Sequence, residues 1–107
     1  MTAIQQIQSA LEQWRKHNFP NAETWEPIMG ACEELGELCH AHLKNHEGVH
    51  TGESFERQAR DAIGDTVIFL MQYCTMMKWD FETIVVDTWD NVKDRDWVTH
   101  PENGVDK

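Results

Sequence analysis

Apolar residues recur at steps of three and four along almost the whole chain, the period of a helix that packs on one side. No segment shows the strict alternation that is typical of a half-buried strand. Segments that break the helical period separate four such stretches. The sequence therefore predicts an all-α fold, an antiparallel bundle of about four helices. We expect one domain over residues 1–107, with a polar tail from about residue 99.

Capping residues predict where the four helices begin. Thr2 and Gln5 form a possible capping box for a helix over residues 2–17. Thr24 is the candidate cap of a second helix that runs to about residue 45. Ser54 precedes a third helix over residues 55–78, and Asp80 precedes a fourth.

Apolar side chains on these helices predict a shared core. The segment 55–78 is apolar around too much of its circumference for a surface helix, so we expect it to be central. A chain of 107 residues buries little surface alone, which favours a homodimer, possibly a tetramer, that completes the core. The second helix carries one apolar stripe, formed by Ile28, Cys32, Leu35, Cys39 and Leu43. The three cysteines are odd in number and lie in apolar stretches, so we expect reduced core thiols.

The charge balance limits the possible partners. Nineteen Asp and Glu residues against nine Lys and Arg give a net charge of −10. Such a surface repels nucleic-acid polymers and anionic lipid, and phosphate chemistry on it requires a cation between protein and substrate. The sequence has neither a signal peptide pattern nor an apolar run long enough to span a bilayer. We expect a cytoplasmic protein without a membrane partner.

Acidic residues are concentrated on two successive helices. Glu33, Glu34 and Glu37 share one surface of the second helix, and Asp61 and Asp65 lie one turn apart on the third. Antiparallel packing of these helices can bring the two patches face to face, where unpaired carboxylates repel each other. A hard divalent cation resolves this conflict. Oxygen ligands suit Mg²⁺ or Mn²⁺.

A solvated acidic face is the simpler interpretation of such a cluster. Gly36 and Gly64 weigh against it, because each costs its helix stability and each lies beside an acidic residue. They suggest that a helix or a ligand approaches closely there.

The acidic motifs resemble those of the MazG-like all-alpha nucleoside triphosphate pyrophosphohydrolases. The family's EExxE motif is matched by EELGE at residues 33–37. Its ExxD motif is matched in part, because Asp65 is present and Ala62 stands where the family has Glu. The resemblance spans about residues 14–97 and includes GELCHAHLK, DAIGDTVIFL and NVKDRDW. It implies a helical bundle built from two chains and magnesium-dependent cleavage between the α and β phosphates of a nucleotide.

The resemblance also implies roles for the acidic residues. Glu34, Glu37 and Asp65 would be metal ligands, and Asp61 is a candidate fourth ligand. Glu33 would be a further ligand or the base that orients the attacking water.

Cations and aromatic residues complete the predicted site. By the resemblance, Asn91, Lys93 and Arg95 approach the phosphates, and Lys44 at the end of the second helix is a further candidate. The alternative for each cation is an interaction with a helix C-terminus. A nucleobase can stack on Trp14 or Trp25, although core packing explains most of the tryptophans.

Two other interpretations of the site remain. Glu37 and His40 match the ExxH pattern of di-iron bundles, but the only other match, at residues 47–50, falls in a connection between helices. The leading hypothesis is an enzyme that hydrolyses a canonical or modified nucleoside triphosphate to the monophosphate and pyrophosphate. The alternative is a non-enzymatic acidic helical dimer that binds a structural metal ion or a basic partner.

Overall fold

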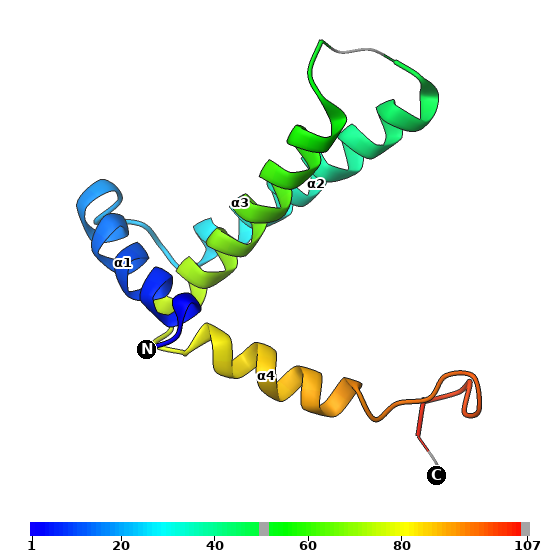
Figure 1. Ribbon diagram of the computed structural model, residues 1–107. Coiled ribbons are helices and arrows are strands. Elements are labelled where there is room, and N and C mark those ends of the chain that lie inside the picture. The colour runs from blue at the N-terminus through cyan, green and yellow to red at the C-terminus, as the bar shows by residue number, and fades with distance from the viewer. Residues whose placement is uncertain (50–51, 106–107) are drawn as a thin grey trace.

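The computed structural model describes residues 1–49 and 52–105. Within these ranges the chain forms helices and connections without a strand, so the prediction of an all-α fold is confirmed (Figure 1). The four helices are α1 (Ala3–Asn18), α2 (Trp25–Glu47), α3 (Phe55–Met76) and α4 (Phe81–Val92).

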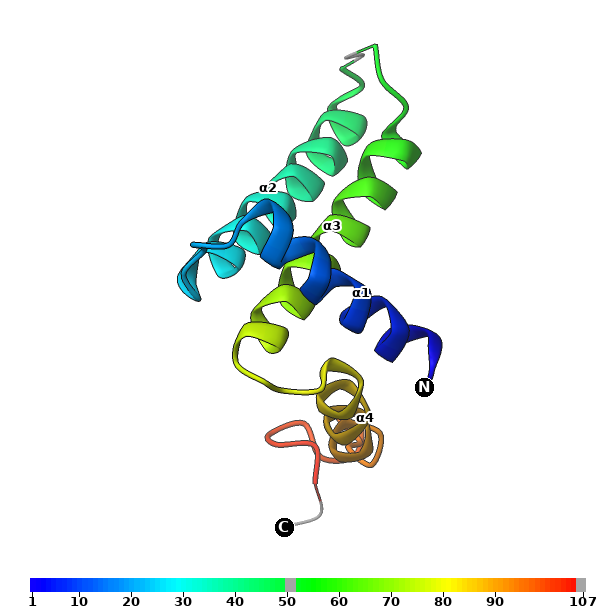
Figure 2. The ribbon, with the colours of Figure 1, turned by 90° about the vertical axis from the view of Figure 1, so that its left-hand side faces the viewer.

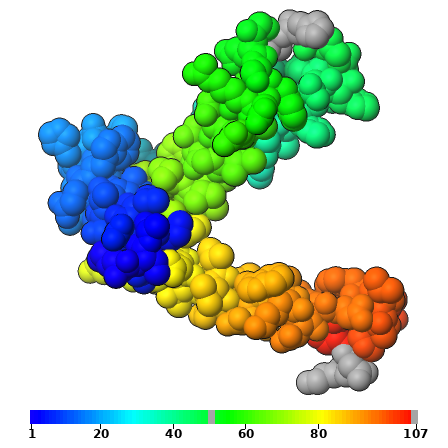
Figure 3. All heavy atoms as spheres, in the orientation of Figure 1, coloured from blue at the N-terminus to red at the C-terminus, as the bar shows by residue number. Residues whose placement is uncertain are grey.

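The helices are arranged as two arms that meet at α1. Helices α2 and α3 lie side by side as a long hairpin, and α1 packs against α3 near its C-terminal end (Figures 1 and 2). Helix α4 contacts α1 and α3 where the arms meet and then runs away from the hairpin. The space-filling view shows the hairpin and α4 as separate arms (Figure 3). Helix α3 therefore contacts all three other helices, and its predicted central position is confirmed.

Capping explains three of the four helix starts. Thr2 and Gln5 form the predicted capping box of α1. The Ser54 and Asp80 side chains accept hydrogen bonds from backbone N–H groups in the first turns of α3 and α4. Thr24 directly precedes α2 but its side chain makes no capping bond, so that detail of the prediction is wrong. The Glu26 side chain instead accepts a hydrogen bond from the backbone of Glu23.

The core of a single chain is small and lies along α3. The buried apolar side chains come from α1, α2 and α3, and none comes from α4. They are Leu11, Pro27, Ala31, Ala41, Ala62, Met71 and Cys74.

The apolar stripe predicted on α2 does not pack against α3. Ile28, Leu35 and Leu43 are exposed, because α2 faces α3 with the small residues Ala31 and Ala41 instead. Two cysteines of the same stripe, Cys32 and Cys39, are exposed free thiols, which corrects the prediction that they are core residues. Cys74 is buried as expected, and burial raises the pKa of its thiol.

A buried glutamine joins α1 to the turn between α3 and α4. The Gln8 Nε2 donates to Thr75 Oγ1 at 3.2 Å and to the Trp79 carbonyl oxygen at 2.8 Å. Its Oε1 accepts a hydrogen bond from the Phe81 N–H at 2.9 Å. Both N–H donors and one of the two oxygen lone pairs of Gln8 are therefore bonded. These bonds join parts of the chain that are far apart in the sequence.

The polar tail folds back on itself beyond α4. The Asp96 N–H donates to the Gly104 carbonyl oxygen, and the Gly104 N–H donates to the carbonyl oxygen of His100. The Asp96 carboxylate also accepts from the N–H groups of Val98 and Thr99. These bonds close a compact loop at the end of the α4 arm.

None of the four helices combines the length and the apolar character that crossing a membrane requires, over the residues described.

Candidate functional site

Acidic residues of α2 and α3 lie near enough for their charges to act on one another. Glu34 is half-buried, and desolvation raises the pKa of its carboxyl. The negative charges of Glu37, Asp65 and Glu33 raise the pKa of Glu34 further. Because Asp65 lies on α3 and the other three on α2, the cluster bridges the hairpin. We call Glu33, Glu34, Glu37 and Asp65 the acidic cluster.

Asp61 stands apart from the acidic cluster. Its carboxylate lies 3.9 Å from the Arg57 guanidinium on an exposed surface of α3, and it is not among the charges that act on Glu34. Ala62, at the position of the family's Glu, is only 3% exposed and belongs to the core. The chain therefore supplies one α3 carboxylate to the cluster.

The cluster is not a closed metal cage. Over residues 1–49 and 52–105, no three Asp, Glu, His or Cys side chains form a group that could hold a metal ion. His50, the end of the second di-iron pattern, lies outside these ranges. Within the described residues, nothing from another part of the chain lies within 4 Å of a Cβ built on Gly36 or Gly64, so the expected close approach of a helix there is wrong for a single chain.

A pocket with aromatic walls opens beside the cluster. Its volume is about 380 Å³, within the range of small-ligand sites. It is lined by the end of α1, the connection to α2, the first turn of α2 and the middle of α3. We call it the aromatic pocket; its lining residues are Trp14, Phe19, Ala22, Glu26, Pro27, Asp65, Ile68, Phe69 and Gln72. Asp65 thus belongs both to the pocket and to the acidic cluster.

The aromatic walls are set by local contacts. The rings of Trp14 and Phe19 meet edge to face, with centroids 5.6 Å apart. The Phe69 ring lies against the backbone of Gly30, where a Cβ would be 2.6 Å from the ring. Gly30, Phe69 and Gln72 were not predicted as site residues. A glycine inside a helix was the only available signal for the first.

The other predicted aromatic residue lies elsewhere. Trp25 is exposed and is not part of the pocket lining. Its indole N–H donates to the Glu23 carboxylate at 2.6 Å.

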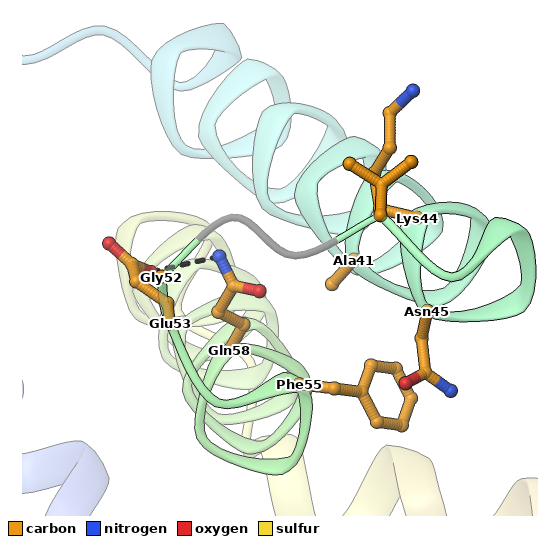
Figure 4. Close-up of a pocket in the computed structure, with 8 residues that line it drawn as sticks. Ala41, Lys44, Asn45, Gly52, Glu53, Phe55 and Gln58 are labelled. Carbon is orange, nitrogen blue, oxygen red and sulfur yellow. Dashed lines mark hydrogen bonds between the residues drawn. The ribbon is translucent and has the colours of Figure 1, made fainter.

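Lys44 lies toward the tip of the hairpin, two turns beyond Glu37 and about 10 Å from it along α2. Its ammonium pairs with Glu47 at 3.1 Å. Figure 4 shows Lys44 at a second pocket, of about 300 Å³, where Glu53 accepts a hydrogen bond from Gln58. Lys44 is thus outside the aromatic pocket.

The predicted phosphate contacts of the last helix are on the other arm. Asn91 and Lys93 lie at the end of α4, Arg95 begins the closed loop, and Lys93 pairs with Asp90 at 3.2 Å. Helix α4 makes no contact with α2 in the described chain. A single chain does not bring these residues to the acidic cluster.

Comparison of the chain with models of protein families, with curated proteins and with solved structures finds no match.

Proposed function

We propose that the protein is a magnesium-dependent nucleoside triphosphate pyrophosphohydrolase that releases a nucleoside monophosphate and pyrophosphate. The observation that carries the proposal is the position of Asp65, which is shared by the acidic cluster and the aromatic pocket. A ring held against Trp14 and Phe69 leaves its phosphates beside the carboxylates. The family resemblance of residues 33–37 and Asp65 supports the same assignment.

The residues fit a magnesium ion that keeps several waters. Such an ion is commonly bound through one or two carboxylates and the substrate phosphates, so a closed cage is not required. Glu34, Glu37 and Asp65 would hold it, because their mutual repulsion is what a cation relieves. When bound, Mg²⁺ would neutralise the triphosphate and the charge that develops on the departing pyrophosphate.

Glu33 is the candidate base. It is exposed and neighbours Glu34, so its carboxylate can orient a water and accept its proton. The water oxygen forms a new bond to the α phosphorus, and the bond from that phosphorus to the bridging oxygen breaks. The electron pair leaves with pyrophosphate. Hydrolysis in this sense needs no further reactant.

We further propose a homodimer in which α2 and α3 of both chains build one core. The exposed apolar residues Leu35 on α2 and Ile63 on α3 support it, since both are about half exposed in the single chain. A second chain would also supply Asn91, Lys93 and Arg95 to the phosphates, because the α4 arm diverges from its own hairpin. Of these, Arg95 offers bidentate donors.

The test is hydrolysis of a nucleoside triphosphate panel with Mg²⁺ or Mn²⁺, measuring pyrophosphate and orthophosphate separately. We expect pyrophosphate alone, and no turnover with chelator. Asp65→Asn should lower kcat/KM at least a hundredfold. Asp61→Asn is the matched control, and retention of activity is expected since Asp61 is paired with Arg57. If both variants lose activity equally, Asp61 is a ligand as the sequence suggested.

The acidic binding module remains the second candidate. It is supported by Ala62, which stands where the family's second motif has a Glu. Turnover that survives the chelator contradicts the metal assignment. If no triphosphate yields pyrophosphate with either divalent ion, the protein is better described as an acidic helical dimer that binds a structural ion or a basic partner.

A further inference from the structure

Gln72 is one of two buried glutamines among the described residues. It lies on α3, is 6% exposed and lines the aromatic pocket. Within residues 1–49 and 52–105, its side-chain amide makes no hydrogen bond. Gln8, the other buried glutamine, makes three.

The Gln72 amide meets solvent, because burying an amide completely without a hydrogen bond is unfavourable. In the described chain no fully enclosed side-chain nitrogen or oxygen lacks a partner, so the Gln72 amide retains access to solvent. The aromatic pocket supplies that access, because Gln72 is part of its lining. The amide is therefore free to bond whatever enters the pocket.

We propose that Gln72 is the specificity-determining residue of the pocket and reads the hydrogen-bonding edge of a nucleobase. This inference rests on the proposed function for the identity of the ligand. Trp14, Phe19 and Phe69 supply apolar aromatic surface for a planar ring. The Gln72 amide has one acceptor oxygen and two N–H donors. It can therefore bond a nucleobase edge on which an acceptor lies beside a donor.

Alternative polar contacts in the pocket have a different chemistry. Glu26 and Asp65 also line it, but as carboxylates they only accept hydrogen bonds. Asp65 is engaged with the acidic cluster, and Glu26 already accepts from the backbone of Glu23. The Trp14 indole N–H can donate as well, but it cannot accept, so the Gln72 amide is the group here that can do both.

The experiment measures binding of the four nucleosides, without phosphate or metal, to the full chain by titration NMR. Gln72→Leu should weaken nucleoside binding about tenfold or more and leave the melting temperature nearly unchanged. Gln72→Glu keeps the size but removes the donors, so it should change the order of preference among bases. Gln8→Leu is the matched control, and it should lower the melting temperature without changing the order of preference.

The outcomes separate this inference from the proposed function. If the wild type binds no nucleoside, or if Gln72→Leu binds all four like the wild type, the inference is wrong even when triphosphates are hydrolysed. If nucleosides bind and their order depends on Gln72, the inference stands even when no pyrophosphate is released. Unfolding curves of each variant establish that it is folded before its affinities are compared.

Discussion

At Gly30 the backbone of α2 lies directly against the Phe69 ring of α3. A Cβ at this position would lie 2.6–2.7 Å from three atoms of the Phe69 ring, so the ring must move if any side chain is added. Phe69 is a wall of the aromatic pocket, and a displaced ring changes the space available to a ligand. Gly30 therefore affects the shape of the pocket, although it is not one of the lining residues.

We predict that Gly30→Ala fails to stabilise the protein, although Ala in a helix is favoured over Gly by about 1 kcal/mol. The clash with Phe69 offsets that gain, because overpacking costs about 1–3 kcal/mol. Combined with Phe69→Leu, the same substitution should become stabilising. Urea unfolding of the four proteins of this cycle measures the difference.

The control for this cycle is Gly36→Ala, since no other element of the described chain comes within 4 Å of a Cβ there. It should stabilise by about 1 kcal/mol. Equal stabilisation by Gly30→Ala and Gly36→Ala contradicts the assigned role of Gly30.

A second residue-scale prediction concerns Glu34. Its pKa is raised above the ordinary 4.5, so the folded protein binds this proton more tightly than the unfolded chain. Stability contributed by Glu34 is therefore lost as the pH rises from about 4.5 through the raised pKa. Glu34→Gln should raise the melting temperature at pH 7 without divalent cations, and the gain should vanish below pH 4.5.

Magnesium should then stabilise the wild type more than Glu34→Gln, because a ligand that binds the folded state shifts unfolding by mass action. Glu56→Gln is the control. Glu56 is an exposed carboxylate at the start of α3, and it pairs with Arg60 one turn later. If Glu34→Gln and Glu56→Gln raise the melting temperature at pH 7 by the same amount, charge repulsion at Glu34 is not the cause.

At this scale the sequence predicted what depends on near neighbours. The caps at Thr2, Ser54 and Asp80 were predictable because each bonds a residue three positions away. Gly30 and Gln72 could not be assigned, since their roles depend on which side chains of other helices lie opposite. The influence of the Asp65 charge on Glu34 follows from the helical period of each segment, which is a local property.

At the scale of elements, Gln8 is the link that holds α1. Gln8→Leu removes three hydrogen bonds and leaves the Trp79 carbonyl and the Phe81 N–H without their partner, while Thr75 keeps its bond to the Met71 carbonyl oxygen. We predict a loss of about 1–3 kcal/mol in unfolding free energy, the usual cost of buried groups left unsatisfied. Thermal or urea unfolding measures it, and Gln13→Leu on the exposed side of α1 is the control.

A loss no larger than that of Gln13→Leu contradicts the role of Gln8 as an anchor. The connection between α1 and α3 could not be predicted, because the partners lie 67 to 73 positions apart in the chain. The extents of the helices could be predicted, since the hydrophobic period and the capping residues are local properties of the sequence. The side of α2 that faces α3 was predicted wrongly. Its small residues are buried against α3, and its larger apolar residues are exposed.

For the whole molecule, openness is the main feature. The radius of gyration is 17.5 Å, whereas a compact domain of this length has about 13 Å. Large apolar residues are exposed along both arms, among them Leu35 at 51% and Trp89 at 60%. Such a surface is more than an isolated soluble domain normally exposes.

We predict that light scattering at micromolar concentration gives twice the mass of one chain. Leu35→Asp should shift the mass toward that of a monomer, because it places a charge in the proposed shared core. Glu47→Asp at the end of α2 is the control. A wild-type protein that stays monomeric and folded under these conditions contradicts the dimer proposal. The exposure of apolar side chains on α3 was predictable from its apolar circumference, but the divergence of α4 was not.

The distant bonding of Gln8 also constrains the order in which the structure forms during synthesis. The hairpin of α2 and α3 is complete once residue 76 has left the ribosome, and its contacts join successive segments. Helix α1 is made before the hairpin, yet its anchor bonds Trp79 and Phe81, which are made some seventy residues later. Helix α1 is therefore fixed in place only after the hairpin that follows it has been made.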